Sequence, residues 1–315
     1  MPPTSVALRH RTACRYERPI TLGPQTIRLR PAPHARTPIL SYALTVLPKP
    51  HTRHRSQDPQ GNFLVRVLFA EPTASFELTV ELEVELVEVN PFDFFLEPGA
   101  ATWPFRYAPL LEQELAPSLG AGPVRPWLAG LLGGLSLGQQ SSVELLVALN
   151  HLVHSRVAYL TRLEPGVQSP EQTLERGSGS CRDVAWLLVQ AARSLGFAAR
   201  FASGYLIQLV QPQSLDPGIK ADGADLHAWA EVYLPGAGWI GFDATSGLIA
   251  GAGHIPLACT VHPDSAAPVS GTLHAGAAAR FEIETTVSRL CPASPTTAMA
   301  DEEGTASRTS SFCNT

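Results

Sequence analysis

The alternation of apolar and polar residues predicts strands over the first part of the chain. The clearest is residues 80–86, in which every second residue is apolar and the three between them are glutamates. A period of two is typical of an antiparallel strand with one buried and one solvated face. Other apolar runs bounded by turn residues occupy 5–12, 26–30, 40–47 and 62–70. These strands predict a β-sandwich-like domain. We interpret the glutamate row as a solvated face rather than a metal site, because no histidine or ligating turn accompanies it.

The middle of the chain predicts helices. Residues 124–132 fit a short helix, and residues 141–156 carry an apolar stripe at helical spacing. The longer helix opens on Ser141 and Glu144, which have the spacing of a capping box. A third helix over residues 181–195 is apolar in nearly every direction, which predicts that it is buried at the centre of a domain.

Strands return after the third helix. Residues 200–209 predict one strand, and residues 226–243 predict a hairpin with a four-residue turn. One or two more strands are expected within 257–289. The Pro-, Gly- and Asp-rich stretch 211–224 predicts a surface loop leading into the hairpin, and the Ser-, Thr- and Ala-rich residues 291–315 predict a disordered tail.

These elements predict an α+β protein in which an N-terminal antiparallel β-sandwich-like domain precedes a central buried helix packed against an antiparallel sheet. The expected segments are an N-terminal β domain (1–95), a linker and helical segment (96–140), a core (141–290) and the tail (291–315).

Composition excludes several classes of function. The 315 residues include 23 Lys and Arg against 28 Asp and Glu, a net charge of −5, so we expect neither a nucleic-acid partner nor a polybasic membrane patch. No apolar run approaches the roughly 20 residues needed to span a bilayer, and the N-terminus has no signal-peptide hydrophobic region. Five scattered cysteines have neither disulfide nor zinc spacing, which favours a reducing, cytoplasmic compartment. The sequence leaves the oligomeric state open.

Cys181 is the first candidate for chemistry. A Gly- and Ser-rich loop precedes it, and it opens the buried helix. The first turn of a helix has backbone N–H groups without intrahelical partners and the positive end of the macrodipole, an environment that stabilises a thiolate and a developing oxyanion. A small buried core cysteine is the alternative, and it is the more common one unless a histidine and a carboxylate accompany the thiol.

The hairpin supplies both of those groups. If Leu234 pairs with Trp239, His227 lies opposite residue 246 and within three positions of Asp243 on the neighbouring strand. A carboxylate at that distance can fix the tautomer of an imidazole, so the three residue types give a nucleophile, a base and an orienting group. Each residue alone could instead have a structural role, His227 in the core and Asp243 in a turn.

Four stretches resemble the bacterial transglutaminase-like core superfamily. They are GSCRDVA at 179–185, LGFAARFASGY at 195–205, HAWAEVY at 227–233 and GWIGFDAT at 238–245. The stretches HRTACRYERPITLGP at 10–24 and IRLRP at 27–31 resemble the N-terminal domain that precedes this core in the same bacterial proteins, and PVSG at 268–271 fits the same subgroup. The resemblance covers residues 5–290. One departure is Ala244, where the family usually has proline.

The resemblance implies a papain-related fold and a Cys–His–Asp triad at Cys181, His227 and Asp243. It implies a cysteine peptidase or amidase acting on peptide or amide substrates, with no cofactor. Three alternatives remain. An amine acceptor in place of water would make the enzyme a cross-linking transglutaminase. The same fold could be a non-catalytic binding module, although an intact triad argues against it. A metal protein using the same three residues is the weakest alternative, because that ligand set is unusual for zinc. His151 and His154, one helical turn apart, lack a third ligand and are expected to be solvated or capping.

Overall fold

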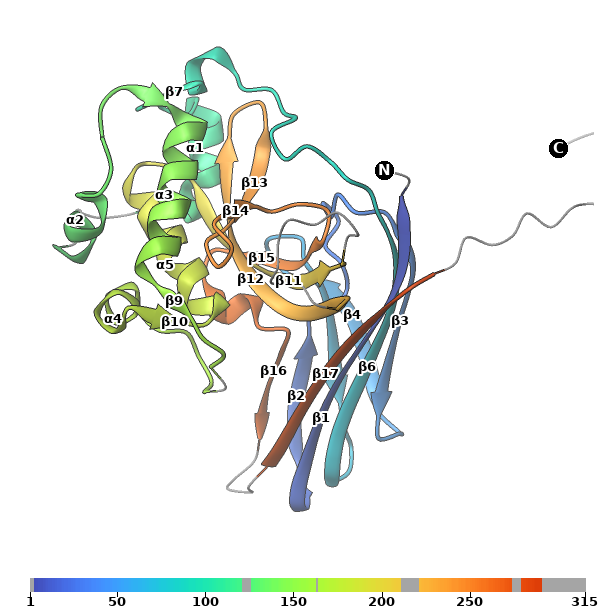
Figure 1. The fold of residues 1–315 in the computed structure, drawn as a ribbon. Helices are drawn as coiled ribbons and strands as arrows, with labels where there is room; N and C mark the ends of the chain where they lie inside the picture. The colour runs from blue at the N-terminus through green and yellow to red at the C-terminus, as the bar shows by residue number, and fades with distance from the viewer. Residues whose placement is uncertain (1–2, 121–125, 163, 211–220, 274–278, 291–315) are drawn as a thin grey trace, which may run out of the picture.

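The computed structural model describes residues 3–120, 126–162, 164–210, 221–273 and 279–290 (Figure 1). Two four-stranded antiparallel sheets form the sandwich at one end of the molecule. One sheet has the order β17 (Ala279–Arg289), β1 (Thr4–Ile20), β6 (Thr73–Leu86) and β3 (Ile39–Leu47). The other has the order β16 (Val269–Leu273), β2 (Leu22–Ile27), β5 (Phe63–Leu68) and β4 (Thr52–Gln57). Apolar residues from both sheets share one core.

The burial along β6 follows the predicted alternation. Val80, Leu82 and Val84 are buried, whereas Glu81 and Glu83 are exposed. The glutamates lie beside basic and small residues of the neighbouring strand, with Glu81 opposite Arg9. The row is therefore a solvated sheet face, as expected.

A separate, five-stranded antiparallel sheet carries the predicted hairpin. Its order is β14 (Leu248–Ile249), β13 (Gly238–Asp243), β12 (Gly223–Leu234), β11 (Ala199–Gln208) and β15 (His254–Thr260). The helices gather on one side of this sheet, and the sandwich lies on the other (Figure 1). The α+β fold class is confirmed.

The central helix α5 (Cys181–Ser194) packs on β11 and β12. Ala185, Leu188 and Ala192, which share a helical face with Cys181, are 0–2 % exposed. Helix α3 (Ser142–Arg156) packs beside α5, and its N-cap hydroxyl, Ser141, accepts from the N–H of Glu144. The predicted buried helix and its neighbour are both present.

Shorter elements surround these two helices. They are η1 (Pro98–Ala100), β7 (Thr102–Trp103), α1 (Pro109–Leu115), η2 (Ala116–Ser118), α2 (Pro126–Leu132), β8 (Gln140–Ser141), β9 (Ala158–Tyr159), α4 (Pro170–Arg176), β10 (Ser178–Gly179) and η3 (Pro263–Ala266). The expected linker 96–140 includes several of them and is bound to the core. The Tyr107 hydroxyl donates to the carbonyl of Tyr233 and accepts from the N–H of Ala198, both at 2.9 Å. None of the described helices is both long and apolar enough to cross a membrane.

Sheet membership differs from the expected segments at the C-terminal end. Strands β16 and β17 fall within the predicted core segment 141–290, yet they pair with β2 and β1 of the sandwich. The alternation of a strand shows which face is buried but not which strand lies beside it. The chain therefore returns to its first sheets after the core. The predicted tail 291–315 lies outside the described residues.

The hairpin register also differs from the expectation. Leu234 lies opposite Gly238, and Tyr233 lies opposite Trp239, so the turn between paired residues has three residues rather than four. Gly236 and Gly238 both have positive φ, 89° and 76°, which permits this tighter turn. Of the predicted loop 211–224, residues 211–220 lie outside the described residues.

Candidate active site

Cys181 is the first residue of α5, and the network around Asp183 fixes that helix start. The N–H and hydroxyl of Ser180 donate to Asp183 Oδ2 at 2.9 and 2.7 Å. The N–H of Gln168 donates to Oδ1 at 2.7 Å, and the Arg162 guanidinium donates to both carboxylate oxygens at 3.0 Å. Asp183 thus joins the loop before α4 to the turn that presents the half-buried thiol.

Sequence reasoning missed Asp183, although a local signal was available. Asp183 follows Ser180 by three positions, the spacing of a capping box. The carboxylate is completely buried. Burial would raise its pKa, but the hydrogen bonds from Arg162, Gln168 and Ser180 lower it, so the group is held ionised beside the first turn of α5.

Replacing Asp183 with alanine is expected to lower the free energy of unfolding by about 3–5 kcal/mol, because it removes the completely buried carboxylate that pairs with the largely buried guanidinium of Arg162. Urea unfolding of the full chain measures the change. Asp264→Ala is the control, since that carboxylate is 76 % exposed and its loss is expected to cost less than about 0.5 kcal/mol. Equal losses in the two variants would contradict a structural role for the Asp183 network.

His227 and Asp243 meet although they lie on different strands. His227 is near the start of β12, Asp243 is the last residue of β13, and His227 Nε2 lies 3.0 Å from Asp243 Oδ2. The His227 ring also interacts with the Cys181 thiol, and this interaction raises the pKa of His227. The structure therefore brings the three predicted site residues together, with the imidazole between the thiol and the carboxylate.

The Asp243 carboxylate receives donors at both oxygens. The N–H and hydroxyl of Thr245 donate to Oδ1 at 2.9 and 2.7 Å. The hydroxyl of Ser246 and Nε2 of His254 lie 3.2 and 3.3 Å from Oδ2, in addition to His227. Ala244, which replaces the proline usual in the family, is buried within this turn, so the turn closes without the proline. Asp243 is therefore held as a fixed acceptor.

These contacts shift the pKa values of His227 and Asp243 in opposite directions. Burial alone would lower the pKa of His227, but hydrogen bonds and charge interactions with Asp243 and Cys181 raise it to about 10. Burial would raise the pKa of Asp243, but hydrogen bonds from His227 and His254 hold it well below its usual range. The imidazolium and the carboxylate stabilise one another.

Trp229 supports the imidazole from the same strand. Its ring stacks on His227 with centroids 6.4 Å apart and 27° between planes. Two glycines leave room for the buried indole. A Cβ at Gly204 would come within 2.5 Å of it, and one at Gly241 within 3.2 Å. A side chain at Gly204 or Gly241 would therefore collide with Trp229, and also with the carbonyl of Ile255 or the side chain of Ala250, respectively.

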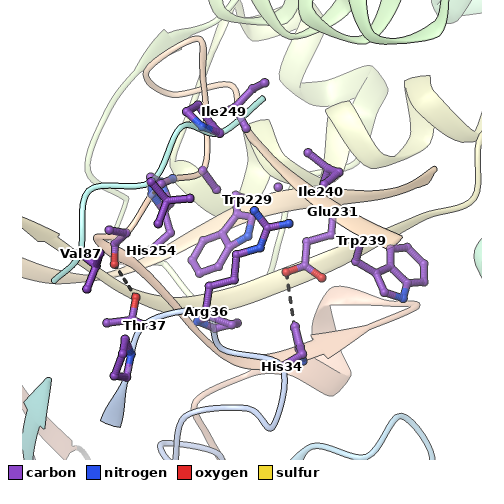
Figure 2. Close-up of a pocket in the computed structure, with 18 residues that line it drawn as sticks. His34, Arg36, Thr37, Val87, Trp229, Glu231, Trp239, Ile240, Ile249 and His254 are labelled. Atoms are coloured by element: carbon purple, nitrogen blue, oxygen red, sulfur yellow. Dashed lines mark hydrogen bonds and ion pairs between the residues drawn. The ribbon is translucent and has the colours of Figure 1, made fainter. Parts of the chain in front are cut away.

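A small pocket lies between this sheet and the sandwich (Figure 2). Its free volume is about 80 Å³, enough for a few water molecules. Trp229 and His254 line it from the five-stranded sheet. His34, Arg36 and Thr37 line it from the segment that connects β2 to β3. His254 thus lines the pocket and also contacts Asp243.

Two groups of described residues bring metal-ligating atoms together, and neither matches the metal alternative that included Cys181. His227, Asp243 and His254 place one ligand atom each within 4.8 Å of one another, as do His34, Glu231 and Cys259.

Hydrogen bonds within the protein already engage residues of both groups. A metal at Nε2 of His254 would require a proton on Nδ1, yet Nδ1 accepts from the N–H of Gly251 at 3.2 Å. In the other group, Arg200 donates to Glu231 at 2.7 Å. The donor sets therefore fit hydrogen-bond networks better than a metal.

Two aromatic residues of the core and the two histidines of α3 lie in different positions. Tyr159 is exposed and interacts electrostatically with Cys181, so it lies near the thiol. Trp186 instead packs on His262, with ring centroids 5.2 Å apart. His154 Nδ1 lies 3.1 Å from the carbonyl of Ala244, and the His151 ring lies beside Gly247. These two histidines contact the turn that follows Asp243.

Two regions of the chain match known families. Residues 6–85 match the bacterial transglutaminase-like N-terminal region, and residues 130–244 match the transglutaminase-like superfamily. Cys181, His227 and Asp243 all lie within the second match. The resemblance predicted from the sequence is confirmed.

The chain is also similar to curated proteins and to a solved structure. Uncharacterized proteins of Mycobacterium tuberculosis and Mycobacterium bovis are 27% identical over 252 residues, covering 75% of this chain and 77% of theirs. A crystal structure from Cytophaga hutchinsonii, described as a candidate cysteine protease, has a TM-score of 0.64 at 20% identity. The alignment covers 93% of this chain and 92% of that one, so the two share a fold.

Proposed function

We propose that this chain, which carries a bacterial transglutaminase-like N-terminal region and a transglutaminase-like core, catalyses cysteine-dependent acyl transfer on peptide or amide substrates. The supporting observation is the arrangement of His227, whose Nε2 lies 3.0 Å from Asp243 Oδ2 and whose ring interacts with the Cys181 thiol. That arrangement joins a nucleophile, a base and an orienting carboxylate in one chain of contacts.

In the proposed reaction the Cys181 thiolate attacks the substrate carbonyl carbon. Because Nε2 of His227 is held by Asp243, Nδ1 is the ring nitrogen left to give its proton to the leaving amine as the C–N bond breaks. First-turn N–H groups of α5, those of Cys181 and Arg182, hold the developing oxyanion. The product of this half-reaction is a thioester on Cys181 and a free amine.

The second half-reaction determines the class of enzyme. Water, deprotonated by His227, would release a carboxylic acid and make the protein a peptidase or amidase. A primary amine would release a new amide and make it a transglutaminase. We favour hydrolysis, which follows the description of the Cytophaga hutchinsonii protein, and keep transamidation as the alternative.

Thiol labelling tests the catalytic proposal directly. Iodoacetamide at neutral pH, followed by peptide mass spectrometry, is expected to modify Cys181 selectively over Cys14 and Cys259. Unselective labelling would favour a non-catalytic binding module. A screen of peptide amides with a fluorescent primary amine then distinguishes acid products from amine conjugates, and elemental analysis for bound metal tests the metal alternative.

The activity is expected to fall as the pH rises through about 10, the pKa of His227. Above that value the imidazole is neutral and has no proton for the leaving amine. The profile of kcat/KM across the alkaline range measures this limb. A limb near 6.5, the ordinary histidine value, would show that the contacts of His227 with Cys181 and Asp243 do not persist in solution.

A further inference from the structure

A second histidine donates to the same carboxylate oxygen as His227. His254, the first residue of β15, places Nε2 3.3 Å from Asp243 Oδ2. Its Nδ1 accepts a hydrogen bond from the N–H of Gly251, so the ring proton is on Nε2 and points at Asp243. The tautomer of His254 is therefore set by the loop that precedes it.

That loop is tied to the N-terminal sandwich. The hydroxyl of Thr37 donates to the carbonyl of Ala252 at 2.7 Å, the contact drawn beside His254 in Figure 2. The N–H of Ala32 also donates to the carbonyl of Pro256 at 2.7 Å. Both sides of His254 in the sequence are thus bonded to the segment that links strands of the sandwich.

Aromatic packing restricts the His254 ring further. It meets the buried Trp229 edge-on, with centroids 5.2 Å apart and 86° between planes. Trp229 in turn stacks on His227. Because the His254 side chain is only 12 % exposed, its ring cannot move away from Asp243 without disturbing the packing of Trp229 and His227.

We propose that His254 is a positioning residue that holds the Asp243 carboxylate in place for His227, and that the sandwich orients His254 through the Thr37–Ala252 hydrogen bond. This assigns the N-terminal region a structural part in the active site. The kinetic consequences rest on the proposed function, whereas the state of the His227–Asp243 hydrogen bond does not.

The first test compares two substitutions of His254. His254→Leu removes the donor and is expected to lower kcat by about 10–100-fold with KM nearly unchanged. The reason is that a misplaced Asp243 carboxylate orients His227 less well, which reduces stabilisation of the transition state. His254→Gln keeps an N–H donor that can reach Oδ2 and is expected to retain most of kcat. If glutamine rescues no better than leucine, His254 acts only by packing and the proposal is wrong.

Proton NMR of the full-length protein gives a readout independent of turnover. The downfield imidazole N–H signal shared by His227 and Asp243 is expected in the parent protein and in His254→Gln. It is expected to broaden in His254→Leu as the carboxylate becomes mobile. An unchanged signal in His254→Leu would overturn the proposal even if no substrate is found.

His154→Leu is the matched control. His154 contacts the carbonyl of Ala244 in the same turn but not the Asp243 carboxylate, so its loss should leave kcat and the NMR signal nearly unchanged. If His154→Leu matches His254→Leu, the effect is a general loosening of the turn and not a property of the His254 contact.

Thr37→Val tests the role of the sandwich. It also provides the test of the proposal in case His254→Leu does not fold. The change removes one hydroxyl donor at nearly constant volume and is expected to lower kcat by about fivefold. Combined with His254→Leu it should add little, because both act through the same ring. Full additivity, or no effect of Thr37→Val on kcat and on the NMR signal, would contradict the proposed link to the sandwich.

Discussion

Cys181→Ala is expected to lower kcat/KM by at least about 10⁴-fold while leaving the melting temperature nearly unchanged. The substitution removes the attacking sulfur, and no neighbouring group supplies a second nucleophile in the proposed mechanism. The stability cost is small, because the thiol is at a helix start and only half-buried, whereas the helix is held by Asp183. Kinetics on the best amide substrate and a thermal melt measure the two quantities.

Cys259→Ala is the matched control for Cys181→Ala. Cys259 is a completely buried thiol whose pKa burial raises far above its ordinary value, so it is unsuited to nucleophilic attack. Its replacement is expected to preserve kcat/KM and to lower the melting temperature modestly by leaving a small cavity. Substantial residual turnover in Cys181→Ala would exclude the proposed mechanism, and a large loss in Cys259→Ala would redirect attention to that cysteine.

Local periodicity was sufficient to predict residues 80–86 of β6 and the buried helix α5. In both elements the buried face is set by apolar residues two positions apart in the strand and three or four apart in the helix. That spacing can be read from the sequence. The candidate site was also predictable, because Cys181, His227 and Asp243 combine the right residue types with stretches that resemble a known family. The structure places these three in contact, while their catalytic roles remain proposals for the experiments above.

Long-range placement was not predictable in the same way. In sheet order two strands, β12 and β11, separate β13 from β15, so no pattern around His254 indicates that its ring reaches Asp243. The pairing of β17 with β1 likewise depends on which strands become neighbours. The hairpin register was wrong by one position because the turn conformation, with positive φ at Gly236, is a property of the folded backbone.

His227→Ala is expected to lower kcat/KM by about 10⁴-fold, and Asp243→Asn by about 10²–10³-fold. The alanine variant loses the group that moves the proton. The asparagine variant keeps the imidazole and keeps an oxygen that can accept from Thr245, so it loses charge and orientation rather than the base itself. Rates of the two variants, measured with the same substrate, test this order.

The pH profile of Asp243→Asn distinguishes an orienting carboxylate from a turn residue. Removing the negative charge withdraws a contact that raises the pKa of His227, so that pKa should fall from about 10 towards its ordinary value. The alkaline limb of kcat/KM should therefore move to lower pH. Ser246→Ala, which removes one weak donor at 3.2 Å, should shift the limb little. If the rate and the alkaline limb of kcat/KM are unchanged in Asp243→Asn, Asp243 has only a structural role in the turn. A carboxylate that stabilises the imidazolium cannot be neutralised without lowering the pKa of His227.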